Sequence, residues 1–225
     1  MPTFLWKIKS RIETYLNSPK RNKKLLNNFL SSLSSDTFFI EIGANDGIEA
    51  DPIYPFVKKN NWSGVYIEPQ KKVFEKLKNN FSSHSNVFFE NIAITENDEE
   101  VTLYIPNTEG NINYSLFASL SPKSGEMSWF EKSQIIEEKV SGKPFKYLVE
   151  KYDLQSKNYV FLLIDVEGQE KQIFNSIDFE FYKPNAILYE HDHLKYSEDR
   201  NIKNMLQDKG YKIYHAKYDS LAVLK

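Results

Sequence analysis

The sequence contains no cysteine in its 225 residues. This absence excludes disulfide bonds, thiolate metal sites and a thiol nucleophile, and it removes any need for an oxidising compartment. The sequence also has no apolar run near the roughly 20 residues that span a bilayer, and its N-terminus mixes apolar residues with Lys and Arg. We therefore expect a cytoplasmic protein without a transmembrane segment or a secretory signal.

Neither sign of charge is in clear excess, since 29 Lys and Arg residues stand against 31 Asp and Glu residues and the formal net charge is -2. A balanced chain has no global field that attracts a polyanion, so we do not expect nucleic acid as a partner. The length allows one catalytic domain with a substantial core and a short extension. The sequence leaves the oligomeric state open.

Residues 1–35 predict an N-terminal helical extension. Apolar residues recur at helical spacing on both sides of Pro19, as at Leu5 and Ile8 before it and at Leu25 after it,. Many of the intervening residues are Lys or Arg. Two interpretations stay open: the helices pack on the catalytic domain, which we favour, or their basic faces contact an anionic membrane surface.

Residues 36–225 predict an α/β domain, because short apolar runs alternate with helical stretches, as in a parallel sheet with crossover helices. We expect strands at 38–42, 64–68, 86–90, 100–105, 159–165, 186–190, 211–215 and 220–224. We expect helices at 53–59, 71–81, 144–152, 170–175 and 198–209. The predicted fold is a Rossmann-like three-layer sandwich whose mostly parallel seven-stranded sheet takes in an antiparallel last strand.

The polar region at about 106–142 is too long for an ordinary connection and predicts an insertion that forms a lid, an acceptor-binding segment or a dimer interface. It contains Phe117, Trp129 and Phe130. These rings either stack on a sugar or cover part of the core, and the sequence leaves both interpretations open.

The clearest motif is the turn after the first strand, which contains Glu41, Gly43, Asn45, Asp46 and Gly47. Glycine permits a tight turn and the close approach of a ligand. Asn45 and Asp46 stand where a dinucleotide-binding turn receives pyrophosphate, and a carboxylate repels phosphate. S-adenosylmethionine (AdoMet) has an ammonium group and a sulfonium but no phosphate. The motif therefore favours AdoMet over NAD.

Further cofactor residues are expected at the ends of the next two strands. Glu68 ends the second strand about 20 residues after the glycine turn, where α/β nucleotide sites place a carboxylate on the ribose hydroxyls. Pro69 fixes the exit of the chain from that strand. After the third strand, Asn91 is expected to contact the adenine through its amide, with Ile92 and Ala93 as an apolar wall.

Two more strands end in acids. Asp165 and Glu167 follow the fourth strand, and Glu190 to His193 follow the fifth. Ligands of open α/β sheets lie at the carboxyl ends of the strands, so these acids should face the same crevice as Glu41 and Glu68. Crowded carboxylates raise one another's pKa, and a cationic ligand, a metal ion or a catalytic need would explain them.

These segments, taken in order, resemble the motif set of FkbM-type methyltransferases. The matching runs are Phe39 to Gly47, Ile67 to Pro69, Asn91 to Ile94, and Ile164 to Glu170, which reads I-D-V-E-G-Q-E. The resemblance covers roughly residues 36–193 and excludes the basic N-terminal segment. It implies a class I AdoMet methyltransferase fold and O-methylation of hydroxyls on carbohydrates or secondary metabolites.

A hydroxyl acceptor needs a base, and His191 is our first candidate because the intrinsic pKa of histidine lies near working pH. Asp165 and Glu167 are the next candidates. Alternatively, Asp165 and Asp192, with Glu190 or His191 nearby, bind Mg²⁺ and activate the acceptor. Two other functions stay open, an NAD-dependent oxidoreductase and a non-catalytic AdoMet-binding or scaffold protein.

Overall fold

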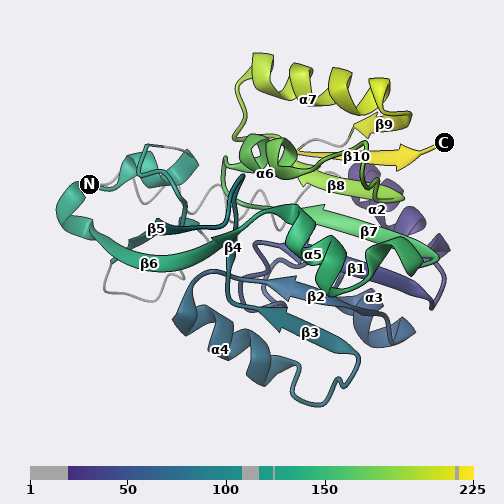
Figure 1. The fold of residues 1–225 in the computed structure, drawn as a ribbon, viewed down its shortest axis with the longest axis horizontal. Helices are drawn as coiled ribbons and strands as arrows, with labels where there is room; N and C mark the ends of the chain where they lie inside the picture. Colours follow the sequence, from purple (N-terminus) through teal and green to yellow (C-terminus); the bar gives the residue numbers. More distant parts are fainter. Residues whose placement is uncertain (1–19, 108–116, 124, 216–217) are drawn as a thin grey trace.

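A computed structural model of the protein describes residues 20–107, 117–123, 125–215 and 218–225 (Figure 1). Its main sheet has seven strands in the order β3-β2-β1-β7-β8-β10-β9. The strands are β1 (Thr37–Ile42), β2 (Ser63–Ile67), β3 (Val87–Glu90), β7 (Tyr159–Ile164), β8 (Ala186–Glu190), β9 (Tyr211–His215) and β10 (Asp219–Leu224).

The directions of the strands confirm the predicted mostly parallel sheet. Strand β1 pairs in parallel with β2 and β7, β2 pairs in parallel with β3, and β7 with β8. Strand β10 lies between β8 and β9 and is antiparallel to both. The last strand is therefore the antiparallel one, as the sequence predicted. The carboxyl ends of β1, β2, β7 and β8 meet at one edge of the sheet.

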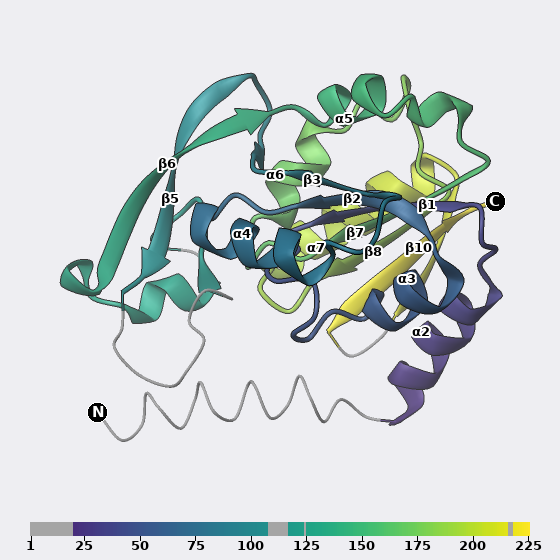
Figure 2. The same ribbon diagram turned by 90° about the horizontal axis from the view of Figure 1, so that it is seen from below.

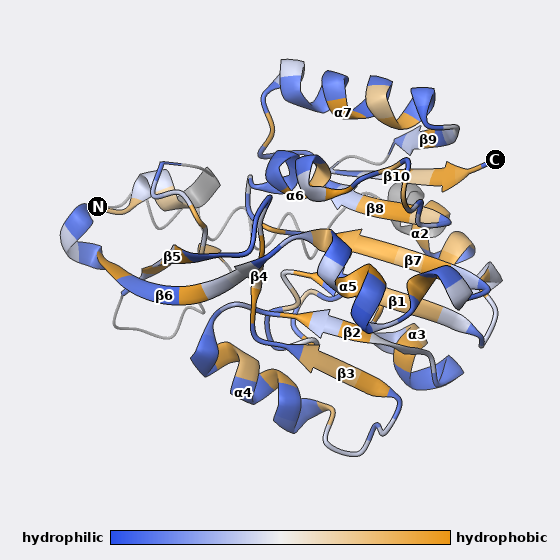
Figure 3. Ribbon diagram, viewed as in Figure 1, coloured by the Kyte–Doolittle hydropathy of each residue, from blue (hydrophilic) through white to orange (hydrophobic). Residues whose placement is uncertain are grey.

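Helices cover both faces of this sheet, which gives three layers (Figure 2). The helices are α2 (Lys20–Ser32), α3 (Tyr54–Asn60), α4 (Lys71–Asn80), α5 (Phe145–Lys151), α6 (Glu170–Ser176) and α7 (Tyr196–Asp208). Side chains alternate along a strand, so Phe38 and Ile40 of β1 join a core with α5, α6 and α7, whereas Phe39 joins a second core with α2, α3 and α4. The sheet is accordingly apolar and the outer helix faces are polar (Figure 3).

A second, smaller sheet extends away from the main one as an arm (Figures 1 and 2). It consists of β4 (Ala93–Ile94), β6 (Ile135–Lys143) and β5 (Glu99–Pro106), in that order. Strand β6 runs antiparallel to β5 along its whole length. The region expected as an insertion thus contributes a strand of its own, together with the 3-10 helices η2 (Gly125–Trp129) and η3 (Lys132–Gln134). A further 3-10 helix, η4 (Leu154–Ser156), follows α5.

The second of the two helices expected at the N-terminus is α2, and the first lies outside the described residues. Leu30 of α2 is fully buried in the core beneath the sheet, with Leu26 and Phe29 partly buried beside it. This face of α2 packs on the α/β domain. No helix in the described ranges is long and apolar enough to cross a membrane.

Candidate functional site

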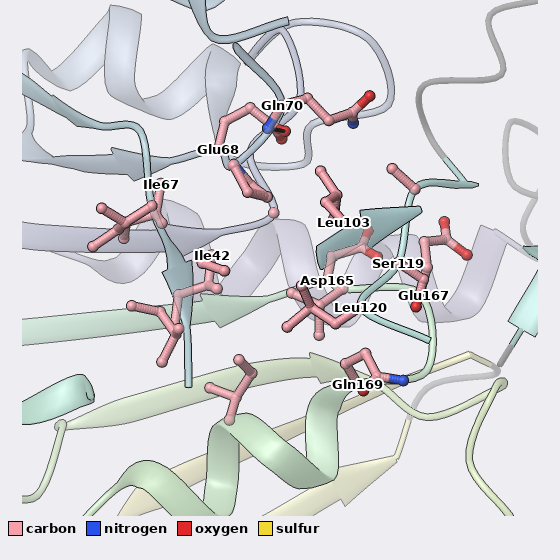
Figure 4. A pocket seen from close by; sticks show the side chains of 18 of the residues that line it. Ile42, Ile67, Glu68, Gln70, Leu103, Ser119, Leu120, Asp165, Glu167 and Gln169 are labelled. Carbon is pink, nitrogen blue, oxygen red and sulfur yellow. Dashed lines mark hydrogen bonds between the residues drawn. The ribbon is translucent and has the colours of Figure 1, made fainter. Parts of the chain in front are cut away.

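Two pockets open at the carboxyl edge of the sheet. The first, with an empty volume of about 690 Å³ that is partly open to solvent, is drawn in Figure 4. The second, of about 980 Å³, lies toward β8. Gly43, Asn45, Asp165 and Glu167 line both pockets. The shared residues show that the two pockets adjoin.

The first pocket is formed by the ends of β1, β2 and β7 and by the segment after β3. Its lining includes Glu68, Pro69, Gln70, Ile92, Ala93, Leu103, Ser119 and Gln169. Figure 4 shows Glu68 and Gln70 on one side of this pocket and Gln169 on the other. Ser119 comes from the arm region, so part of the expected insertion closes the pocket.

Glu68 is a buried carboxylate held in place by backbone donors. Its Oε2 accepts a hydrogen bond from the N–H of Asn45 at 2.9 Å, and its Oε1 accepts one from the N–H of Gln70 at 2.8 Å. Burial raises the pKa of Glu68 to about 7, although both backbone donors oppose the shift. The group is thus poised between its acid and its carboxylate near neutral pH.

The turn after β1 requires glycine at position 43. Gly43 has a φ of +87°, and a β-carbon there would lie 1.8 Å from the carbonyl oxygen of Asp165. The backbone of β1 therefore touches that of β7 where the two pockets meet. Asn45, with a φ of 48°, also adopts the left-handed conformation, and its side chain accepts a hydrogen bond from the N–H of Asp46 at 2.8 Å.

Three residues expected to bind the cofactor make contacts that support this turn and its neighbour. Asp46 accepts hydrogen bonds from the N–H groups of Ile48 and Glu49. A β-carbon on Gly47 would clash with the ring of Phe81 and a methyl group of Leu77. Asn91 donates its amide to the carbonyls of Glu68 and Pro69 at 2.8 and 2.9 Å. None of the three lines either pocket.

The second pocket is rich in acids. Its lining includes Glu41, Glu49, Asp51, Asp165, Glu167, Glu190, Asp219 and His193, and none of its described lining residues is Lys or Arg. Burial raises the pKa of Glu41 and of Asp165 well above the usual range, and neighbouring acids add to both shifts. Glu41 Oε2 is buried and has no hydrogen-bond partner among the described residues. Such an oxygen is costly to bury, so this pocket suits a cationic ligand.

His193 lies at the centre of an acidic cluster that the sequence interpretation did not select. Its Nε2 is 3.0 Å from a carboxylate oxygen of Glu167 and 3.0 Å from one of Glu190. Burial alone lowers the pKa of His193, but these two acids outweigh it and raise the pKa to about 11. A turn closed by the N–H of Leu194 on the carbonyl of His191 brings His193 back over Glu190.

His191, the first candidate for the base, lines neither pocket. Its N–H donates to the carbonyl of Tyr218 at 2.7 Å, and its Nδ1 lies 3.1 Å from the hydroxyl of Ser220. Burial lowers the pKa of His191, with a smaller effect of Lys203. Asp192 is exposed and also lies outside both pockets. The structure brings Asp165 and Glu167 to the site, whereas His191 and Asp192 lie outside it.

Glu170 supports the loop that carries Asp165 and Glu167. It is fully buried at the start of α6, and its Oε1 accepts hydrogen bonds from the N–H groups of Val166 and Gly168, both at 3.3 Å. Glu167 has a φ of 53° in this loop, an uncommon conformation for a residue with a side chain. The I-D-V-E-G-Q-E motif therefore places two acids at the pockets and one beneath them.

Phe117 and Phe130 lie in a small core of the arm with Met127. Both rings are buried, so most of their surface is used in packing. Phe117 also lines the second pocket. The arm thereby contributes an apolar wall to each pocket, Phe117 to the second and Leu103 to the first.

The order of the strands, the antiparallel β10 and the pockets at the carboxyl edge define a class I AdoMet-dependent methyltransferase fold. The chain belongs to the FkbM methyltransferase family, whose domain matches residues 41–213. A comparison with curated proteins finds no match.

One solved structure agrees with this fold. The methyltransferase FkbM from Methylobacillus flagellatus KT is similar with a TM-score of 0.54 and 13% identity, over 85% of this chain and 44% of that one. This chain thus spans less than half the length of that protein. Weaker similarity is found to the precorrin-6y C5,15-methyltransferase of Geobacter metallireducens GS-15, with a TM-score of 0.42 and 14% identity over 89% and 88% of the two chains. An RNA methyltransferase of Salinibacter ruber in complex with S-adenosyl-L-homocysteine has a TM-score of 0.40 and 11% identity over 92% and 91%.

Proposed function

We propose that this protein transfers the methyl group of AdoMet to a hydroxyl oxygen of a carbohydrate or another small-molecule acceptor. The observation that carries the proposal is the pair of pockets that meet at Gly43, Asp165 and Glu167. The first pocket would hold the adenosine portion of the methyl donor, and the second would hold its methionine portion beside the acceptor. Methyl transfer needs donor and acceptor held in line with water excluded.

AdoMet fits the first pocket in its chemistry. The carboxylate of Glu68 would accept hydrogen bonds from the ribose hydroxyls, and Ile92 and Ala93 would cover the adenine, since all three line that pocket. Past Gly43, the unpartnered Oε2 of Glu41 would receive the ammonium group of the methionine portion. A close approach of ligand to backbone is possible at Gly43 because it carries no side chain.

Asp165 or Glu167 would take the proton of the acceptor hydroxyl. Both line the two pockets and so lie where donor and acceptor meet. Burial, reinforced by Glu190 and Glu167, raises the pKa of Asp165, and a carboxylate with a raised pKa is a stronger base near neutral pH. We assign the first candidacy to Asp165 and not to His191, because the hydrogen bonds of His191 belong to β10 and the preceding turn.

The affinity for AdoMet should depend on pH through Glu68. Only the carboxylate form can accept hydrogen bonds at both oxygens, and the pKa of Glu68 is about 7. Between pH 6 and pH 8 the affinity should rise about tenfold, because Glu68 is protonated in most molecules at pH 6 and in few at pH 8. Calorimetry with AdoMet at several pH values measures this slope.

The variant Glu68→Gln isolates the effect of Glu68 from those of other acids, and it should bind AdoMet with a flatter pH profile. An unchanged slope in Glu68→Gln would show that another group titrates.

The folding stability of the unliganded protein should depend on pH in the opposite direction to AdoMet affinity. A raised pKa favours the protonated native state, so the contribution of Glu68 to folding stability is lost as the pH rises through about 7,.

Acceptor chemistry is tested with AdoMet labelled in its methyl group and a panel of glycans, nucleotide sugars and hydroxylated metabolites. We expect label on a hydroxyl oxygen of at least one panel member, located by mass spectrometry. Label only on nitrogen or carbon would refute O-methylation. Binding of AdoMet without transfer to any panel member would favour a non-catalytic AdoMet-binding protein.

A further inference from the structure

We infer that the ends of β7 and β8 form a binding site for a divalent metal ion with Glu167, Glu190 and His193 as its ligands. The three side chains offer two carboxylate oxygens and one imidazole nitrogen, all within 4.8 Å of one another. This site differs from the Asp165 and Asp192 pair considered from the sequence. Its use in the reaction rests on the proposed function, whereas metal binding itself does not.

The distances around His193 suit an ion better than a single proton. Nε2 is 3.0 Å from an oxygen of Glu167 and 3.0 Å from an oxygen of Glu190. One N–H points in one direction and serves one acceptor well, yet two acceptors, one in the loop after β7 and one at the end of β8, stand at the same distance. Two ligand atoms at right angles around an ion with bonds of about 2.1 Å lie about 3.0 Å apart, so an ion at this position needs little rearrangement.

A second observation points to a cation in the same pocket. Asp51 also lines the second pocket, and its Oδ1 accepts hydrogen bonds from the N–H groups of Ile53 and Tyr54 at 2.7 and 3.1 Å. The Asp51 carboxyl also interacts with the buried hydroxyl of Tyr66, whereas Glu41 Oε2 is buried and has no hydrogen-bond partner among the described residues. The carboxylate of AdoMet offsets one of its two positive groups, so the acids that line this pocket outnumber the positive charge that AdoMet brings.

The ligand set indicates which ion fits. An imidazole with two carboxylates suits Mn²⁺ or Zn²⁺ better than Mg²⁺, which prefers oxygen ligands and bound water. Glu167 lines both pockets, so an ion on it would lie close to where the acceptor meets the methyl donor. An acceptor hydroxyl bound to such an ion loses its proton more readily.

The test is calorimetry of the metal-free protein, prepared with EDTA, against MnCl2 and ZnCl2 in the absence of AdoMet. We expect one site in the native protein and at least about tenfold weaker binding in His193→Ala and in Glu190→Gln. His191→Ala is the matched control, since His191 lies two residues away and outside both pockets. It should bind the ion as the native protein does.

Glu190→Gln keeps the size of its side chain, so it still tests the site if His193→Ala folds poorly. The inference is overturned if native protein binds neither ion more tightly than millimolar, or if His193→Ala and Glu190→Gln bind as the native protein does. AdoMet titrated in EDTA separates the two proposals. AdoMet binding without metal binding removes this inference alone, and metal binding without AdoMet binding removes the proposed function alone.

Discussion

Replacing Glu68 with Ala is expected to weaken AdoMet binding about 100-fold. The carboxylate would accept hydrogen bonds from two ribose hydroxyls, and hydrogen bonds to charged groups contribute about 1.5–3 kcal/mol, which corresponds to such a factor. Glu68 also holds the N–H groups of Asn45 and Gln70, so its loss loosens both sides of the pocket. Isothermal titration calorimetry with AdoMet measures the change.

Glu75→Ala is the matched control for this change, because Glu75 is an exposed residue of α4 whose partner is Lys78. We expect Glu75→Ala to bind AdoMet as the native protein does. A thermal melt of each variant shows whether it is folded. Native affinity in Glu68→Ala would refute the assignment of the ribose to Glu68, and tight binding of NAD without binding of AdoMet would favour an oxidoreductase.

Gly43→Ala should destabilise the fold by about 3 kcal/mol or more. The new β-carbon would lie 1.8 Å from the backbone oxygen of Asp165, directly after β7, which cannot turn aside, and the φ of +87° is itself unfavourable for alanine,. For a domain of this length, that loss lowers the melting temperature by roughly 6–12 °C. Urea unfolding and calorimetric melting measure it.

Gly210→Ala separates the clash from the unfavourable φ. Gly210 has a φ of +99°, but the nearest atom to a β-carbon there is a methyl of Leu224 at 3.7 Å. This variant should lose only about 1 kcal/mol, the cost of the left-handed conformation. Equal losses at the two positions would mean that β1 and β7 can separate at their ends without cost.

Local sequence patterns predicted most of the main sheet, because its strands are buried on both faces and read as continuous apolar runs. All six residues of β1 are buried. Strand β6 was missed, since its residues are mostly polar and it is held by pairing with β5 over a long separation in sequence. Pairing between distant segments leaves little trace in a local pattern.

The site likewise has parts that the local sequence predicted and parts that depend on the folded geometry. Acids that directly follow a strand, such as Glu68 and Asp165, line a pocket at the edge of the sheet where the sequence places them, because the carboxyl ends of parallel strands meet there,. Choosing between His191 and His193 required the geometry of the turn after β8, which decides which ring faces the pocket. The spacing of three residues from Glu190 to His193, typical of a turn that returns on itself, was the available signal.

The support roles of Asp46 and Asn91 depend on hydrogen bonds that a sequence motif does not distinguish from ligand contacts. An Asx turn at Asp46 and amide bonds from Asn91 to two carbonyls stabilise the loops that shape the pocket,. A motif therefore marks residues that build a site as well as residues that touch its ligand.

The central claim is that the carboxylates at this sheet edge surround a cationic cofactor without phosphate. A crystal structure with AdoMet bound tests it most directly. We predict ribose hydroxyls on Glu68, the adenine against Ile92 and Ala93, and the amino group near Glu41, all of which line the two pockets. A ligand bound elsewhere, or one in these pockets with its ribose away from Glu68, would contradict the claim.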